Sequence, residues 1–126
     1  LYHYLSGFYH SFCKLSSIFT EFYQKHPNQE IFYITRYAKK VYSDEDYSLP
    51  TKDYYFMFGR ESTGIPYDVL KNHLDHCLRI PMQRNARSLN LSNCVALVSY
   101  EACRQQDFYL LATEETFKGA DFLLKE

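Results

Sequence analysis

Hydrogen-bonding and cationic side chains are concentrated between Arg79 and Asn93, directly before an apolar helical pattern. The stretch has a short apolar entry, one proline, the two arginines Arg84 and Arg87, and then a run of Ser and Asn. Such a loop offers backbone groups, hydroxyls, amides and cations to a small polar ligand. The same residues also suit a structural turn that ends in a helix cap. Taken alone, the stretch leaves both interpretations open.

A second candidate site is the turn in which Gly59 and Gly64 bracket residues 60–63. It follows an apolar run and precedes Pro66, which is typical of the first position of a helix. Open α/β sheets bind nucleotides at glycine-rich turns between a strand and a helix. This turn is neither a P-loop, because Lys-Ser/Thr does not follow Gly64, nor a GxGxxG dinucleotide fingerprint. The spacing of the two glycines alone is explained by tight packing of the strand against the helix as well as by a bound ligand.

The elements that must position these two turns are predicted from the apolar patterns. Runs without polar alternation are typical of strands covered on both faces, and apolar residues repeated at three and four positions are typical of helices. We expect strands at 31–35, 54–58 and 78–80, and helices at 15–23, from Pro66 through Cys77, at 92–106 and at 113–125, with a loop or short crossover at 36–53 and no firm element in 1–14. The predicted fold is α/β, a mostly parallel sheet with helices on both faces.

Composition limits the classes of function. A chain of 126 residues with 46% hydrophobic residues is expected to be one folded domain and is not a disordered segment. The formal charge of −1 gives no overall attraction to nucleic acid, so an RNA contact needs a local basic patch or a symmetric partner that doubles one. Four cysteines without a CxxC pair suit a reducing cytosol, and we expect a cytoplasmic protein with no membrane partner.

The two turns together carry a family resemblance. Phe58–Pro66, followed by Ile80-Pro81-Met82, then Arg87–Asn93 and later Tyr100-Glu101-Ala102, resembles the last two motifs of SPOUT-superfamily RNA 2′-O-methyltransferases. The nearest branch is the small single-domain one that methylates the ribose of the wobble nucleotide of certain tRNAs. The resemblance is sharp over residues 54–105. It implies a deep trefoil knot in the C-terminal part, bound S-adenosylmethionine, a tRNA substrate and a homodimer.

The resemblance also implies a cofactor pocket formed by the knot loops. By analogy the residues that line it are Ile34, Thr35, Gly59, Ile80, Ser88 and Leu89. Gly59 makes physical sense there, since the absence of a side chain lets the backbone approach a ligand. Ile80 and Leu89 would sandwich the adenine. For Ile34 and Ile80 an ordinary place in the core is the alternative.

The chemistry that the resemblance implies is in-line attack of a ribose 2′-hydroxyl on an activated methyl group. Ser88 and Asn90 are the candidate catalytic residues, because they can orient the hydroxyl by hydrogen bonds. Glu61 and Arg87 are expected to fix the two loops together. The candidate RNA contacts are Arg60, Arg84 and Arg87, with Arg36, Lys39 and Lys40 as further phosphate contacts. For each of these cations alone, a solvated surface charge is the simpler explanation.

One departure from the family pattern concerns the N-terminus. The first motif of the family carries an Asn and a catalytic Arg, and residues 1–14 hold no counterpart of it. We therefore expect one SPOUT domain over 1–126, truncated at its N-terminus. The alternatives are a non-catalytic RNA-binding or dimerisation remnant of the same fold, and a nucleotide-binding α/β protein of another kind.

A metal site is a weaker hypothesis. His73, His76 and Cys77 stand at i, i+3 and i+4 of the predicted helix, which would place them on one face. No fourth ligand is evident from the sequence, so no metal is expected.

Overall fold

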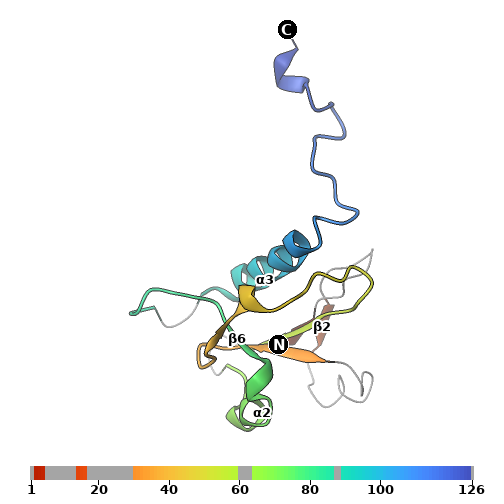
Figure 1. Cartoon of the computed structure of the whole chain (residues 1–126). Coiled ribbons are helices and arrows are strands. Elements are labelled where there is room, and N and C mark those ends of the chain that lie inside the picture. The colour runs from red at the N-terminus through yellow and green to blue at the C-terminus, as the bar shows by residue number, and fades with distance from the viewer. Residues whose placement is uncertain (1, 5–13, 17–29, 60–63, 87–88, 126) are drawn as a thin grey trace.

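A four-stranded parallel sheet forms the centre of the molecule (Figure 1). The computed structural model describes residues 2–4, 14–16, 30–59, 64–86 and 89–125. The strands are β3 (Ile31–Ile34), β4 (Lys40–Val41), β5 (Tyr55–Phe58) and β6 (Cys77–Arg79), in the spatial order β4-β6-β3-β5 with parallel pairing throughout. The α/β prediction and the three predicted strands are therefore confirmed.

A separate antiparallel pair lies at the start of the chain. It joins β1 (Tyr2–Tyr4) to β2 (Lys14–Ser16), with Tyr2 opposite Ser16, and β1 lies against β5. The prediction that a helix begins at Leu15 is wrong, because Leu15 is in β2. Ser16 is also in β2, and residues 17–23 of that predicted helix lie outside the described residues.

The central strands are apolar on both faces because each face has its own cover. Alternate side chains of a strand point to opposite sides of a sheet. Phe32, Phe56 and Leu78 accordingly belong to one buried cluster, while their neighbours Tyr33 and Met57 belong to another. The two layers that cover the sheet account for the absence of polar alternation in the sequence.

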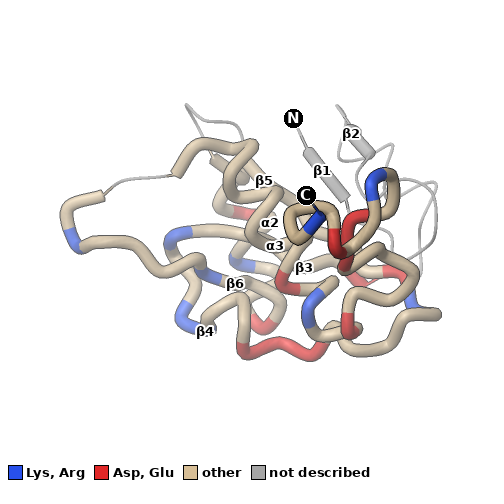
Figure 2. Tube along the Cα trace, turned by 90° about the horizontal axis from the view of Figure 1, so that it is seen from above, with Lys and Arg blue, Asp and Glu red and all other residues tan. Residues whose placement is uncertain are grey.

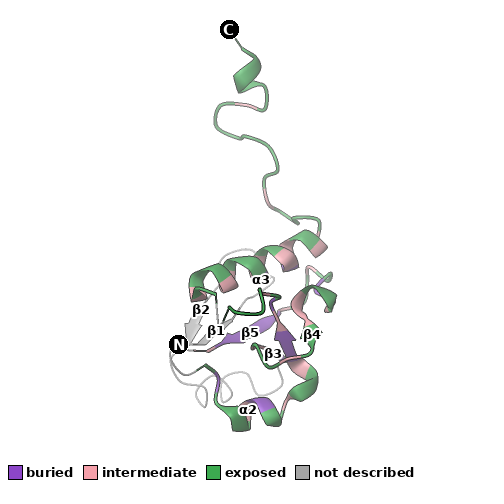
Figure 3. Cartoon of the chain, turned by 90° about the vertical axis from the view of Figure 1, so that its left-hand side faces the viewer, coloured by how far each residue is buried: buried purple, intermediate pink, exposed green. Residues whose placement is uncertain are grey.

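Helix α3 (Leu91–Gln105) covers the first face, and α2 (Tyr67–Lys71) covers the second (Figure 3). The predicted helix 92–106 is thus confirmed within one residue. Val98 and Ala102 of α3 are buried against the first cluster, as expected from their spacing of four. On the other face Leu70 of α2 is buried in the second cluster.

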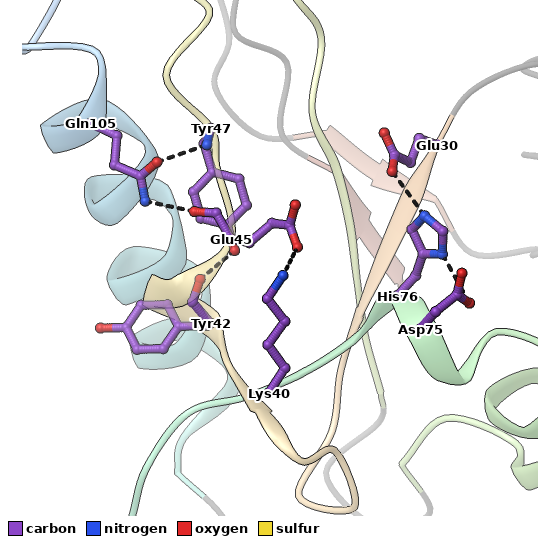
Figure 4. A network of polar contacts seen from close by, with 8 residues as sticks. All are labelled: Glu30, Lys40, Tyr42, Glu45, Tyr47, Asp75, His76 and Gln105. Atoms are coloured by element: carbon purple, nitrogen blue, oxygen red, sulfur yellow. Dashed lines mark hydrogen bonds and ion pairs between the residues drawn. The ribbon is translucent and has the colours of Figure 1, made fainter.

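The end of α3 is fastened to the segment after β4. The amide of Gln105 accepts a hydrogen bond from Tyr47 N at 2.7 Å and donates one to the carbonyl of Glu45 at 3.0 Å (Figure 4). A short 3-10 helix, η1 (Tyr42–Asp44), lies next to α3, and the Tyr47 hydroxyl donates to the carbonyl of Tyr42. Because Tyr47 is fully buried, these bonds fix the position of α3 over the sheet.

The predicted helix from Pro66 through Cys77 is too long. After α2 the chain forms a 3-10 helix, η2 (Leu74–His76), and Cys77 is already the first residue of β6. The ring of His73 lies 4.8 Å from that of Tyr33, and the ring of His76 lies 5.5 Å from that of Phe32, so the two histidines contact opposite faces of the sheet. The helical face suggested for a metal does not exist, and the described residues contain no cluster of three metal-ligating side chains.

His76 has a structural role in the described part of the chain. Its Nε2 lies 2.8 Å from a carboxylate oxygen of Glu30, and its Nδ1 lies 3.2 Å from Asp75 (Figure 4). Although burial opposes the charged form, the hydrogen bonds to the two carboxylates leave the pKa of His76 raised. The imidazole thus ties η2 to the residue just before β3.

Two predictions in the remaining segments are wrong. The segment 36–53 contains a strand, β4, which two residues are too short to reveal by periodicity. Residues 113–125 do not form the predicted helix but extend away from the body, with a single 3-10 turn, η3 (Phe122–Leu124) (Figure 1). Phe117 is 97% exposed there, so the apolar stripe has no surface to cover, and a short helix without a packing partner is marginal in water.

Among the described residues, no helix combines the length and the apolar character needed to cross a bilayer.

Candidate functional site at the carboxyl edge of the sheet

The carboxyl ends of β3, β5 and β6 lie in one row. Ile34 is paired with Phe58 on one side and with Leu78 on the other. The N–H of Thr35 donates to the carbonyl of Leu78 at 2.9 Å, which continues the row one residue further. The segments that leave this edge are therefore those that the sequence singled out: 35–39, the turn after Gly59, and the loop after Arg79.

Gly59 is required by the way in which its own turn closes. A Cβ placed on Gly59 would lie 2.4 Å from the carbonyl carbon of Gly64 and 2.5 Å from Ile65 N. These are backbone atoms that no side-chain rotation can move. Gly64 itself has φ +68°, a conformation that glycine adopts without strain. The intervening candidates Arg60 and Glu61 lie outside the described residues.

The two isoleucines of the predicted pocket are mainly core residues. Ile80 is 7% exposed and belongs to the buried cluster of the α3 face, and Ile34 packs against that cluster. Their backbones, rather than their side chains, stand at the edge. Leu89 is 37% exposed and offers uncovered apolar surface, whereas Ser88 lies outside the described residues.

Thr35 holds the turn that follows β3. Besides the bond to Leu78, its carbonyl accepts from Ala38 N at 3.4 Å, and its hydroxyl accepts from Tyr37 N at 3.3 Å. These bonds fold the chain back immediately after the strand, so that residues 36 and 37 stay close to the edge.

Asn90 is the N-cap of α3. Its side-chain oxygen accepts from Ser92 N at 2.9 Å and from Asn93 N at 3.4 Å. The helix-cap interpretation of this stretch is confirmed, and it does not exclude a ligand role, because the amide N–H₂ of Asn90 takes no part in the cap. Burial raises the pKa of the thiol of Cys94, in the first turn of α3.

Cations gather at the same edge despite the net negative charge. The described residues of 35–43 and 79–90 include Arg36, Lys39, Lys40, Arg79 and Arg84 and no acidic side chain. Figure 2 shows basic residues on the protruding loop, residues 81–86, and beside β4 and β6, with acidic residues in the segment that follows β4. The guanidinium of Arg79 donates to the carbonyl of Arg36, which joins β6 to the segment after β3, and Lys40 is paired with Glu45 at 2.6 Å. Of the predicted RNA contacts, Arg84 is exposed in this loop, whereas Arg87 lies outside the described residues.

Sequence reasoning missed two exposed tyrosines at this edge. The hydroxyls of Tyr37 and Tyr67 lie 3.2 Å apart, and Arg36 Nη2 donates to the Tyr37 hydroxyl at 2.8 Å. The hydrogen bond with Tyr67 and then that from Arg36 lower the pKa of Tyr37, while the bond between the two hydroxyls raises the pKa of Tyr67. Their separation of thirty positions gives no local signal from which the contact could have been found.

Comparison with known proteins assigns the family. The family model described as the SpoU rRNA Methylase family matches residues 7–100, which include both turns and most of α3. The chain belongs to the SpoU rRNA Methylase family. Its match begins before β2 and ends within α3, so the extended tail lies outside the SpoU match.

Relatives of this SpoU chain are methyltransferases by name. A protein of Listeria monocytogenes named "Putative tRNA (cytidine(34)-2'-O)-methyltransferase" is 50% identical over 97 residues, which are 77% of this chain and 57% of that protein. The chain thus spans less than two thirds of the length of this relative.

Solved structures of RNA methyltransferases are similar to this chain. A putative RNA methyltransferase from Bacillus anthracis is 49% identical with a TM-score of 0.74, and the match covers 79% of this chain and 62% of that one. An AdoMet-bound rRNA methyltransferase from Sinorhizobium meliloti is 25% identical with a TM-score of 0.57, and the match covers 74% of this chain and 34% of that one.

Replacing Gly59 tests the closure of the first turn. We expect Gly59→Ala to lower the free energy of unfolding by roughly 1–3 kcal/mol, because the new methyl group overlaps backbone atoms of Gly64 and Ile65. Urea unfolding followed by circular dichroism measures the change.

Thr113→Ala is the control. Thr113 is exposed in the extended tail, so its replacement by the same small residue is expected to stay within about 0.5 kcal/mol. Equal stability of the two variants would contradict the closed turn.

Proposed function

We propose that this chain takes part in S-adenosylmethionine-dependent methylation of the ribose 2′-hydroxyl of the wobble nucleotide of tRNA. The observation that carries the proposal is the row formed by Ile34, Phe58 and Leu78, from which both motif loops leave the sheet at one edge. The family match and the name of the Listeria relative, a tRNA (cytidine(34)-2'-O)-methyltransferase, support the same reaction.

The residues at this edge fit an adenosine-containing cofactor. Nucleotides bind open α/β sheets outside the carboxyl ends of the strands, where backbone groups are available. The backbones of Thr35, Gly59 and Ile80 stand at that edge, and Leu89 offers exposed apolar surface for a purine. Ile34 and Ser88 complete the proposed set. When bound, S-adenosylmethionine supplies a methyl group activated by its sulfonium, and the chain then has to hold the ribose in line with it.

The work of this chain in the reaction is positioning. The amide N–H₂ of Asn90 donates to a ribose oxygen while its carbonyl oxygen remains in the helix cap. Ser88 is proposed as the second group that orients the ribose. Arg84, together with Arg60 and Arg87, holds phosphates of the RNA. The cations at the edge supply the attraction that a net charge of −1 cannot supply.

The proposal includes the trefoil knot. β6 lies between β3 and β4, two strands that follow each other in the chain. To reach that place the chain passes the connection 35–39, and it is fastened there through Thr35 to Leu78 and Arg79 to Arg36. This insertion of a late strand between two earlier ones supports a threaded arrangement within a single SPOUT domain.

A homodimer in the cytoplasm completes the proposal. Leu97 and Tyr100 are 42% and 65% exposed on the outer side of α3, and a second copy would cover them. A symmetric dimer would also double the basic edge.

The reaction is tested with the whole chain, S-adenosylmethionine and a tRNA anticodon stem-loop. We expect binding of the cofactor in titration calorimetry and transfer of a labelled methyl group to the ribose of the wobble nucleotide, detected by mass spectrometry of nuclease digests. Cofactor binding without transfer would favour the non-catalytic remnant, and better binding of ATP or NAD would overturn the assignment of the cofactor.

Two substitutions of Asn90 separate its cap from its proposed contact with the ribose. Asn90→Asp retains an oxygen for the cap, whereas Asn90→Ala removes it and is expected to cost about 1 kcal/mol of stability. Both variants lose the amide donor, so we expect each to lower the rate of methyl transfer roughly tenfold or more. Full activity of Asn90→Asp would show that Asn90 serves only as a helix cap.

A further inference from the structure

Tyr37 and Tyr67 form an exposed aromatic pair that joins the turn after β3 to the start of α2. Tyr37 lies in the turn after β3, and Tyr67 is the first residue of α2, after the Gly59–Gly64 turn. Their ring centroids are 5.6 Å apart and their planes meet at 84°. Tyr37 is 55% exposed and Tyr67 is 61% exposed, so much of both rings faces solvent.

The pair is held in place although it is exposed. Arg36 donates to the Tyr37 hydroxyl at 2.8 Å, and its guanidinium carbon lies 4.9 Å from the centre of the Tyr37 ring. The carbonyl of Arg36 in turn accepts from the guanidinium of Arg79. Hydrogen bonds from three elements thus fix the rings before any ligand arrives, which lowers the entropic cost of binding.

This exposure contrasts with that of the tyrosines in the core, although Tyr100 and Tyr109 are exposed as well. Tyr33, Tyr47, Tyr54 and Tyr55 are all at most 5% exposed. Fixed aromatic faces beside guanidinium groups match the chemistry of sites for unpaired nucleic acid, where bases stack on the rings and cations hold the phosphates. A purely apolar partner would leave the cations around the pair without a counter-charge.

We propose that Tyr37 and Tyr67, with Arg36 beside them, form a stacking platform for an unpaired base of the RNA, next to the nucleotide that is methylated. This inference rests on the proposed function and names the part of the substrate that these residues recognise. Tyr37 stands three positions after Ile34, at the end of β3, so a base on the platform is a near neighbour of the candidate site. Recognition by stacking requires a loop and excludes continuous duplex.

The test measures RNA binding by the whole chain with fluorescence anisotropy. The probes are a labelled tRNA anticodon stem-loop and a duplex of the same length without a loop. Loss of a stacked base lowers affinity by about 5- to 150-fold. We expect Tyr37→Ala and Tyr67→Ala to weaken binding of the stem-loop within this range and to leave duplex binding unchanged.

Matched variants separate the ring from other contributions. Tyr37→Phe and Tyr67→Phe retain the ring but lose the hydroxyl bonds that fix it, so each is expected to weaken binding of the stem-loop by roughly two- to fivefold and by less than the corresponding alanine variant. Phe117→Ala removes an aromatic ring that is 97% exposed in the extended tail and is expected to change nothing. Arg36→Ala removes a proposed phosphate contact and is expected to lower the slope of log Kd against log salt concentration by about 1. The tyrosine variants are expected to leave this slope unchanged.

The outcomes distinguish this inference from the proposed function. If the unsubstituted chain binds no RNA, both are overturned. If it binds the stem-loop and the alanine variants bind equally well, or if the phenylalanine variants lose as much affinity as the alanine variants, the platform alone is overturned. A change in sedimentation of the alanine variants would instead make the pair an interface between copies, which also overturns the platform.

Discussion

The backbone pairing of β6 with β3 is the constraint on which the rest of the structure depends. Ile34 is opposite Leu78, and the Thr35 N–H donates to the Leu78 carbonyl. This register sets the level at which β6 ends, and therefore where the loop after Arg79 leaves the sheet. A slip of the register by one residue would exchange the two faces of β6. The side chain of Leu78, now fully buried in the cluster on the α3 face, would then point to the cluster on the α2 face. The buried clusters thus hold in place the edge on which the candidate site is built.

Two residues at this edge have structural roles that do not compete with ligand roles. Gly59 is needed because its turn closes onto the backbone of Gly64, and the ligand role proposed for it uses backbone groups, which this requirement leaves unchanged. Asn90 uses its oxygen for the cap of α3 and keeps its N–H₂ group for a ligand. At positions 59 and 90, the geometry of the fold and the proposed chemistry therefore require the same residue type.

The sequence predicted those parts whose pattern is local. The buried strands at 31–34 and 55–58 and helix α3 follow from continuous apolar runs and from helical periodicity. β4 could not be predicted, because two residues carry no period and their pairing with β6 depends on contacts distant in sequence. Residues 113–125 have an amphipathic pattern but no surface to pack on, so the helix that the pattern predicts does not form. The roles of Ser88, Arg60 and Arg87 stay predictions, since these residues lie outside the described part of the chain.

The tyrosine pair was missed because its contact exists only once the register of the sheet is set. Tyr37 lies in the turn after β3 and Tyr67 begins α2, and the two meet because β3 and β5 are parallel neighbours. In this way one edge gathers aromatic, cationic and backbone groups that are dispersed over the sequence.

The most direct test of the central claim, that the carboxyl edge binds the methyl donor, is a titration of the ¹⁵N-labelled chain with S-adenosylmethionine followed by amide chemical shifts. We expect the largest shifts on Thr35, Gly59 and Ile80, which follow the ends of three neighbouring strands, and on Leu89 in the loop after β6. Saturable shifts confined to other parts of the fold, or no shifts at all, would contradict it.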